Sequence, residues 1–285
     1  MKCFTALSVL VTLACSAYAT PVESRNATVE ARNGPGKRGL AWPWYNGSLN
    51  PAKMNINPGT VNLIYDWETY AVPSTNGNGG LNYIGMQRCT DCSSSPIGSL
   101  AARQQQLGFS TVFTLNEPDI NGISPSSAAS WYIQWVNPLA IKKALPAVTS
   151  STNAGQGLDW VAQFISACGG QCFYDYINIH WYGNSFGDFQ NFVNSAHSRF
   201  PNNQLVITEF ALQGGASQAA QISFFKQAIS FLDGASFVNM YFPFVATSPA
   251  LFQANDPAGA ASIGTGSCLY NNDGSVSAVG QLFYQ

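Results

Sequence analysis

Charged side chains are scarce in this sequence: Asp, Glu, Lys and Arg make up 9 % of its 285 residues. The first 38 residues hold five of the 12 Lys and Arg but two of the 14 Asp and Glu, so the rest of the chain carries a formal net charge of −5. An acidic chain is unsuited to binding nucleic acid or an anionic membrane surface. The composition therefore argues against both partners and suits a neutral polymer as substrate.

Long apolar runs are absent after residue 20, where none approaches the ~20 residues of a membrane span. The apolar stretch 4–17 precedes Ala17-Tyr18-Ala19, a pattern typical of a secretory signal peptide that ends at residue 19. Residues 20–38 are polar and end in Lys37-Arg38. We interpret them as a pro-peptide cleaved after Arg38, with an uncleaved tail as the alternative. The remaining domain is 39–285, and we expect a secreted monomer without a membrane anchor.

Histidine is rare as well, since the sequence contains only His180 and His197. A structural zinc site needs four well-spaced ligands. We therefore expect no metal, and no motif indicates a cofactor.

Five cysteines remain once the signal peptide is removed, and an oxidising compartment favours disulfides. Cys168–Cys172 closes a glycine-rich loop after a helical stretch and is the first candidate pair. Cys89–Cys92 is a second, local candidate, which leaves Cys268 unpaired. Asn46 begins an Asn-Gly-Ser triplet, a possible glycosylation site.

Short apolar runs alternate with amphipathic helical patterns along the chain, which indicates βα units and a parallel sheet. The glycine fingerprint of a doubly wound nucleotide-binding sheet is absent. Eight such units in about 247 residues predict an α/β fold, a (β/α)8 TIM barrel in a single compact domain. The expected strands are 39–44, 61–67, 82–88, 111–115, 144–149, 176–181, 205–210 and 237–244.

Glutamate is the most informative scarcity, because only Glu68, Glu117 and Glu209 remain after residue 38. All three fall at the predicted C-terminal ends of strands, where barrel enzymes carry their active sites. Cleavage of a glycosidic bond needs one carboxyl group to donate a proton and a second to attack. Glu117 and Glu209 lie on strands 4 and 7, across the barrel mouth, which suits the ~5 Å separation of a retaining enzyme. A salt bridge at a strand end is the alternative for each residue alone.

Five stretches of the sequence carry recognisable motifs: Lys-Arg-Gly-Leu-Ala from Lys37, Tyr-Asp-Trp from Tyr65, Asn-Glu-Pro-Asp from Asn116, His-Trp-Tyr-Gly from His180 and Thr-Glu-Phe-Ala from Thr208. These motifs resemble glycoside hydrolase family 128, the fungal β-1,3-glucanases, within the (β/α)8 retaining glycosidases that carry catalytic glutamates on strands 4 and 7. The resemblance implies that Glu117 is the acid/base and Glu209 the nucleophile. Glu117 must then hold a proton, so we expect burial and the nearby Glu209 carboxylate to raise its pKa.

Further side chains near these motifs are candidates for binding a sugar. Asn116 suits the 2-hydroxyl, Tyr182 suits Glu209 as a hydrogen-bond donor, and His180 suits a hydroxyl or a catalytic carboxyl. Glu68 competes weakly for a catalytic role and otherwise suits a sugar hydroxyl or a main-chain amide. Aromatic planes can stack on sugar rings, and the alternative for each of them is a place in the core. These aromatic candidates are Trp42, Trp44, Tyr45, Trp67, Trp181 and Phe244.

The sequence therefore predicts a secreted, retaining endo-β-1,3-glucanase. One alternative is a glycosidase that acts on another β-glycan, such as mannan, cellulose or β-1,6-glucan. A second alternative is a glucan-binding wall protein without turnover. The β-1,3-glucan substrate depends on the resemblance alone, whereas the glutamate pair follows from position and composition.

Overall fold

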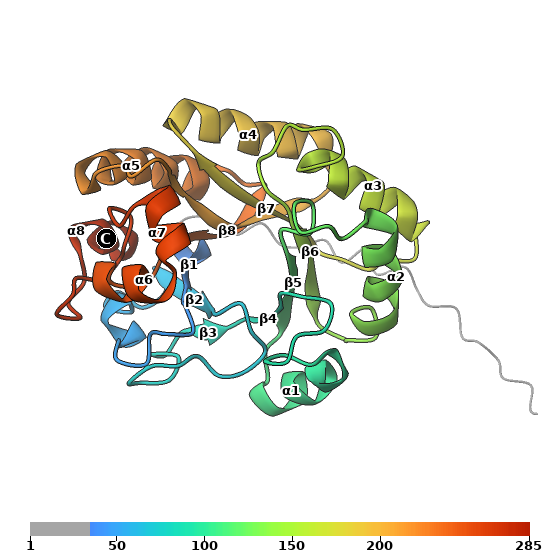
Figure 1. The fold of residues 1–285 in the computed structure, drawn as a ribbon, viewed down its shortest axis with the longest axis horizontal. Coiled ribbons are helices and arrows are strands. Elements are labelled where there is room, and N and C mark those ends of the chain that lie inside the picture. Colours follow the sequence, from blue (N-terminus) through green and yellow to red (C-terminus); the bar gives the residue numbers. More distant parts are fainter. Residues whose placement is uncertain (1–34) are drawn as a thin grey trace, which may run out of the picture.

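The computed structural model describes residues 35–285, which form a barrel of strands surrounded by helices (Figure 1). The predicted signal peptide, 1–19, and most of the predicted pro-peptide, 20–38, lie outside the described residues. No helix within the described part is long and apolar enough to cross a bilayer.

All named strands pair in parallel, in the order β3-β2-β1-β9-β8-β7-β6-β5-β4. Ile84 alone separates β3 from β4, and these two pieces pair with β2 and β5. The predicted third strand therefore joins both ends of the sheet and closes the barrel, so the eight-strand prediction is confirmed with its third strand divided. The strands are β1 Arg38–Ala41, β2 Val61–Tyr65, β3 Asn82–Tyr83, β4 Gly85–Gln87, β5 Thr111–Asn116, β6 Lys142–Ala147, β7 Tyr176–Gly183, β8 Gln204–Leu212 and β9 Val238–Pro243.

Helices connect the later strands, whereas β1 and β2 are joined by a loop that carries only a 3-10 turn. Serine hydroxyls accept backbone N–H groups at the starts of α2, α4, α5, α6 and α8, which stabilises these helix ends. The helices are α1 Leu100–Leu107, α2 Pro125–Trp135, α3 Leu158–Cys168, α4 Phe186–Arg199, α5 Gln218–Gly234, α6 Pro249–Asn255, α7 Pro257–Ile263 and α8 Ala278–Tyr284, and the 3-10 turns are η1 Pro35–Lys37, η2 Pro51–Met54 and η3 Ile97–Ser99.

Apolar side chains fill two layers. The barrel interior holds a cluster that includes Tyr65, Phe113 and Phe242, and a larger cluster lies between the strands and the helices. Successive residues of a strand point to opposite faces, so each strand supplies both layers.

The basic pair Lys37-Arg38 belongs to the folded domain. Lys37 is fully buried, and its ammonium donates to the carbonyls of Leu232, Asp233 and Ala235 at the end of α5. Arg38 begins β1, forms a 2.7 Å ion pair with Asp233 and donates to carbonyls at the end of α8. Cations stabilise helix C-termini, where carbonyl groups lack partners. Cleavage after Arg38 stays a prediction. Because both residues are buried, the protease would have to reach them before the domain folds.

Both predicted disulfides, Cys168–Cys172 and Cys89–Cys92, are present, and Cys268 is free and buried. The structure argues against the possible glycosylation of Asn46. Asn46 is fully buried, and its Nδ2, the atom that would carry the glycan, donates to the Ala246 carbonyl over 2.7 Å.

Candidate active site

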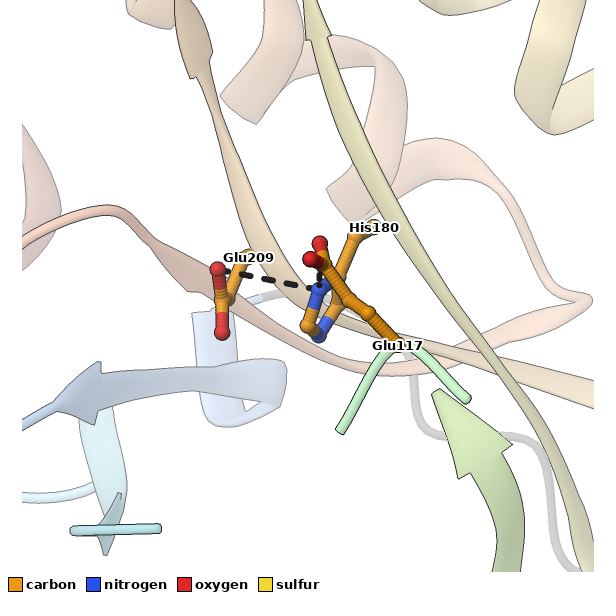
Figure 2. A group of neighbouring side chains, drawn as sticks. All are labelled: Glu117, His180 and Glu209. Atoms are coloured by element: carbon orange, nitrogen blue, oxygen red, sulfur yellow. Dashed lines mark hydrogen bonds and ion pairs between the residues drawn. The ribbon is translucent and has the colours of Figure 1, made fainter. Parts of the chain in front are cut away.

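The C-terminal ends of β5, β7 and β8 bring Glu117, His180 and Glu209 together (Figure 2). Glu117 directly follows β5 with φ +48°, and Trp67 follows β2 closely with φ +59°. They are the two non-glycine residues with positive φ in residues 35–285. Such conformations cost of order 1–3 kcal/mol each and cluster at functional sites. The backbone therefore adopts an unfavourable conformation at two positions of this mouth, Trp67 and Glu117, and in each case this sets the direction of the side chain.

Glu209 is buried and held by two donors, one on each carboxylate oxygen. Trp67 Nε1 donates to Oε1 over 2.7 Å, and the Tyr182 hydroxyl donates to Oε2 over 2.6 Å. Burial raises the pKa of Glu209 most strongly; His180, Tyr182 and Trp67 oppose that effect, and the net direction is upward. The two hydrogen bonds favour the charged carboxylate and fix its orientation.

Glu117 contacts His180 instead, with 3.0 Å between its Oε1 and the ring Nδ1. Burial acts to raise the pKa of Glu117, but the hydrogen bond and the charge of His180 outweigh it, and the pKa is lowered. The predicted upward shift is therefore wrong for the free enzyme. The contact between His180 and a catalytic carboxyl was expected, but the predicted shift considered only burial and Glu209 and left out the charge of His180.

His180 is fully buried between the two glutamates, with its Nδ1 3.6 Å from Oε2 of Glu209. Burial acts to lower the pKa of His180, but the Glu209 carboxylate and then Glu117 raise it, and the net shift is upward. Its Nε2 lies 2.8 Å from the Thr208 hydroxyl, which in turn donates to Asn178 Oδ1. Sequence reasoning missed Asn178 and missed any polar role for Thr208, although both precede predicted residues by one or two positions.

The two carboxylates are close enough to act on one bond. One ligand-type atom from each of Glu117, His180 and Glu209 lies within 4.8 Å of the others. This is the one cluster of three such groups found among residues 35–285. Its spacing would also admit a divalent cation, but each atom already has a protein hydrogen-bond partner within the site.

An aromatic wall borders the glutamates. Phe244 follows β9, and its ring lies 6.2 Å from that of Trp67 and 5.5 Å from that of Tyr182. Tyr45 packs in the same cluster, and Trp44 beside it is 62 % exposed. Tyr45, Trp67 and Phe244 therefore lie where the sequence placed them, at the mouth. Trp67 has a second contact, because its indole nitrogen is bonded to Glu209.

Two aromatic predictions are wrong. Trp181 is buried, and its ring stacks on Phe224 at 5.5 Å in the outer layer, because its neighbours His180 and Tyr182 both point inward. Trp42 is fully buried, with its Nε1 donating to the Pro73 carbonyl. Neither side chain is available to a sugar.

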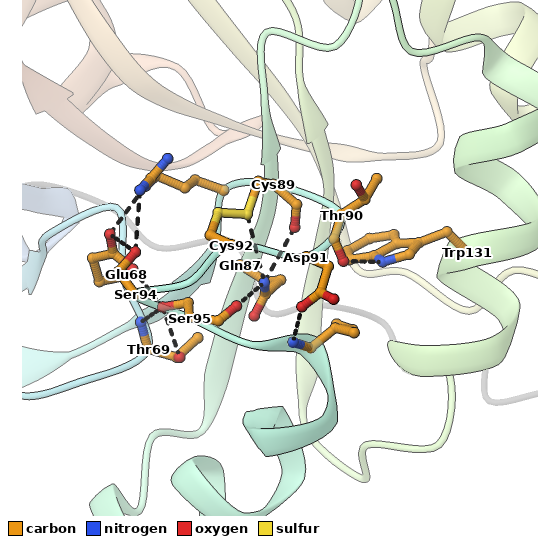
Figure 3. Close-up of a disulfide and its surroundings, with 12 residues drawn as sticks. Glu68, Thr69, Gln87, Cys89, Thr90, Asp91, Cys92, Ser94, Ser95 and Trp131 are labelled. Carbon is orange, nitrogen blue, oxygen red and sulfur yellow. Dashed lines mark hydrogen bonds and ion pairs between the residues drawn. A yellow bond between two sulfur atoms is a disulfide. The ribbon is translucent and has the colours of Figure 1, made fainter.

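The prediction for Glu68 is also wrong, because its carboxylate anchors a loop of the protein and does not face a ligand (Figure 3). Its Oε1 accepts from Arg88 Nε over 3.0 Å and from the Ser94 hydroxyl over 2.8 Å, and its Oε2 accepts from Ser95. The disulfide Cys89–Cys92 lies in the loop that these residues anchor. Both oxygens of Glu68 accept from side chains of the protein, and the residue is buried, so its carboxylate serves the loop and not a sugar.

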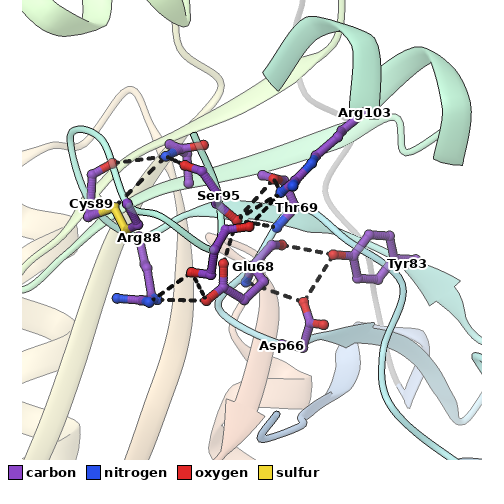
Figure 4. A network of polar contacts seen from close by, with 11 residues as sticks. Asp66, Glu68, Thr69, Tyr83, Arg88, Cys89, Ser95 and Arg103 are labelled. Atoms are coloured by element: carbon purple, nitrogen blue, oxygen red, sulfur yellow. Dashed lines mark hydrogen bonds and ion pairs between the residues drawn. A yellow bond between two sulfur atoms is a disulfide. The ribbon is translucent and has the colours of Figure 1, made fainter. Parts of the chain in front are cut away.

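The network continues behind Glu68 (Figure 4). Arg103 donates to Thr69 and Ser95, and the Tyr83 hydroxyl contacts Asp66 Oδ1 at 3.0 Å. Burial raises the pKa of Asp66 well above its ordinary value. The acidic residues after β2, Asp66 and Glu68, therefore build the rim of the barrel.

Asn116 and Asp119 flank Glu117 in different ways. Asn116 ends β5, and its Oδ1 is buried without a hydrogen-bond partner in the described part of the chain. Asp119, whose role sequence reasoning missed, accepts from Thr149 and from the backbone N–H of Gly157. Asp119 thus ties the turn after Glu117 to the loop before α3.

Comparison with known proteins supplies the family. The sequence model described as "Glycosyl hydrolase catalytic core" matches residues 39–283. A family 128 (subgroup IV) endo-β-1,3-glucanase of Lentinula edodes is 62 % identical, with a TM-score of 0.86, over 88 % of this chain and 100 % of the other. The chain belongs to glycoside hydrolase family 128. It is a glycoside hydrolase, as the sequence predicted.

Two more distant relatives extend the comparison. A family 128 (subgroup III) structure from Blastomyces gilchristii, described as a curdlan-specific exo-β-1,3-glucanase in complex with glucose, is 25 % identical, with a TM-score of 0.67, over 89 % of this chain and 100 % of that one. Alkali-sensitive linkage protein 1 of Schizosaccharomyces pombe is 31 % identical over 259 residues. The match covers 87 % of this chain but 44 % of that protein, so the chain spans less than half of its curated relative.

Proposed function

We propose that this chain is a secreted, retaining endo-β-1,3-glucanase that uses Glu209 as nucleophile and Glu117 as acid/base. The observation that carries the proposal is the glutamate pair, with carboxylate atoms within 4.8 Å of each other. Retaining enzymes hold their carboxyl groups ~5–5.5 Å apart, whereas inverting enzymes need ~6.5–9.5 Å to admit a water molecule. The short separation therefore favours direct attack by one carboxylate.

The surroundings of the pair divide the two roles. Glu209 has two fixed donors, Trp67 and Tyr182, which favour an ionised and oriented nucleophile. Glu117 contacts the one titratable neighbour at hydrogen-bond distance, His180, from which it can gain or lose a proton. An acid/base catalyst must change its protonation state twice in each cycle, and a nucleophile must begin as an anion.

The reaction then follows in two displacements. Glu117 protonates the glycosidic oxygen while Glu209 attacks the anomeric carbon, so the C–O bond breaks and a glycosyl ester forms. Glu117 next removes a proton from water, which attacks the same carbon and releases Glu209. Asn116 Oδ1, which lacks a protein partner, suits a sugar hydroxyl beside the reacting carbon.

The β-1,3-glucan substrate and endo action are proposed from the 62 % identical relative, which carries that description. Purified protein should release reducing ends from a linear β-1,3-glucan, with the β-anomer formed first by NMR and a range of oligosaccharides in the product ladder. Glu209→Gln should lower kcat by at least ~1,000-fold, the scale expected for loss of a nucleophile.

Each rival function has its own outcome. Hydrolysis of mannan or cellulose without hydrolysis of β-1,3-glucan would refute the substrate. Release of glucose alone from chain ends would refute endo action. Binding of β-1,3-glucan oligosaccharides without turnover at any pH would favour a wall-binding protein.

A further inference from the structure

A chain of buried side chains extends from the acid/base glutamate into the barrel. It runs from Glu117 Oε1 to His180 Nδ1, from His180 Nε2 to the Thr208 hydroxyl, and from that hydroxyl to Asn178 Oδ1, over 3.0, 2.8 and 2.8 Å. His180, Thr208 and Asn178 are all fully buried. The proposed reaction uses only the first member, so the other three need an explanation.

The direction of the hydrogen bonds follows from the chemistry of the groups. An amide oxygen can only accept, so the single hydroxyl hydrogen of Thr208 goes to Asn178. The Thr208 oxygen must then accept from His180, which places a hydrogen on Nε2. In neutral histidine the other nitrogen, Nδ1, is then a bare acceptor that faces Glu117 at 3.0 Å and Glu209 at 3.6 Å.

Two carboxylates opposite a bare ring nitrogen repel its lone pair, so a proton is retained between them. We propose that Thr208 and Asn178 keep the His180 hydrogen on Nε2, so that His180 Nδ1 and Glu117 Oε1 share one further proton, the one that Glu117 delivers to the leaving oxygen. The inference rests on the proposed function. Thr208 and Asn178 are positioning residues, because they act through His180.

The protons and charges balance through the first displacement. In the free enzyme His180 carries the proton, and the three groups sum to −1. When sugar fills the cleft and excludes water, the buried ion pair becomes less favourable than the neutral pair. The Nδ1–H bond then breaks as the Oε1–H bond forms, and Glu117 passes that proton to the glycosidic oxygen. After attack, Glu117 is a carboxylate, Glu209 an ester and His180 neutral, so the sum is still −1.

The second displacement restores the starting state. Water gives a proton to Glu117, the ester is cleaved, and the proton returns to Nδ1 as Glu209 becomes a carboxylate again. The return is consistent with the raised pKa of His180, which burial opposes and Glu209 and Glu117 produce. Asp119 also favours the cation. The facing phenols of Tyr182 and Tyr65 are buried, their pKa values lie well above the ordinary value, and they do not titrate in this range.

Nitrogen-15 NMR of ring-labelled histidine tests the tautomer directly, because the chain has two histidines. His197 stacks on Phe237 away from the site, so His197→Gln assigns the remaining resonance to His180. Above the pKa of His180 we expect hydrogen on Nε2 and none on Nδ1. Hydrogen on Nδ1 would mean that Asn178 presents its Nδ2 to Thr208, and it would overturn the proposal.

Kinetics supply a second test. Thr208→Val removes the acceptor, so deprotonated His180 can turn its hydrogen to Nδ1 and donate to the Glu117 carboxylate. Loss of the shared proton becomes easier, and the basic limb of kcat/KM should move to lower pH by about 1 unit or more. Thr208→Ser keeps the hydroxyl and should restore the wild-type limb.

The outcomes separate this inference from the proposed function. A wild-type chain that hydrolyses β-1,3-glucan, with the same basic limb in Thr208→Val, would overturn the inference alone. A chain without hydrolysis would refute the function, while the NMR result still decides the tautomer. The wild-type spectrum also decides it should Thr208→Val fail to fold.

Discussion

Removal of the Tyr182 hydroxyl tests how the nucleophile stays ionised. Tyr182 donates to Glu209 over 2.6 Å and Trp67 over 2.7 Å, so Tyr182→Phe leaves one of the two donors. A hydrogen bond to a charged group contributes ~1.5–3 kcal/mol, and one pKa unit corresponds to about 1.4 kcal/mol. The pKa of Glu209 should therefore rise by about 1–2 units. Because Glu209 must be ionised to attack, the acidic limb of kcat/KM should move to higher pH by the same amount.

The assay is the pH profile of reducing-end release from a linear β-1,3-glucan. Tyr174→Phe is a matched control, since Tyr174 packs against the outer core layer and has no contact with the glutamates. It should keep the wild-type profile. An acidic limb that stays in place while activity falls equally at every pH would refute the reasoning, because the hydroxyl would then act on position and not on ionisation.

Two further predictions concern residues whose roles the structure reassigns. Glu68→Gln should lower the melting temperature, because Glu68 anchors three side chains of the rim. Its kcat/KM should stay within about tenfold of wild type. A loss of activity as large as that of Glu209→Gln would contradict a purely structural role. Lys37→Met should lower the free energy of unfolding in urea by about 2–3 kcal/mol, because three carbonyls lose a buried donor, whereas the exposed Lys226→Met should change it little. Cleavage of the folded chain between Arg38 and Gly39 by a protease specific for paired basic residues would contradict the burial of that pair.

Local periodicity was enough to predict the barrel and the position of Glu117 and Glu209 at its mouth. Apolar runs mark the strands, and the position of a glutamate at a strand end places it at the mouth. The same periodicity was also sufficient to exclude Trp181. Neighbouring strand residues point to opposite faces, so a site that contains His180 and Tyr182 leaves Trp181 on the helix side, where it packs on Phe224.

Other roles depend on partners that are distant in the sequence. Glu68 meets Ser95 across 27 positions, and Lys37 meets the Leu232 carbonyl across 195. In the sequence alone, the basic pair Lys37-Arg38 looks like a processing site. Only the fold shows that both side chains contact the end of α5. The pKa direction of Glu117 failed for the same reason, because no local pattern gives its 3.0 Å distance to His180.

An irregularity in β8 explains how one strand supplies both the proposed nucleophile, Glu209, and Thr208, which contacts His180. Between β7 and β8, Ile179 faces Ile207 and His180 faces Glu209, so Thr208 is an extra residue in β8. An extra residue forms a β-bulge, which bends the strand and re-aims the side chains that follow. Val206 fills the barrel interior and Phe210 packs in the outer layer, although strict alternation would send both inward. The reversal falls between them, so Thr208 and Glu209 both reach His180, and Phe210 anchors the strand to the helices. The Thr-Glu-Phe motif therefore combines a hydrogen-bond partner of His180, the proposed nucleophile and a core contact only because the strand is bulged.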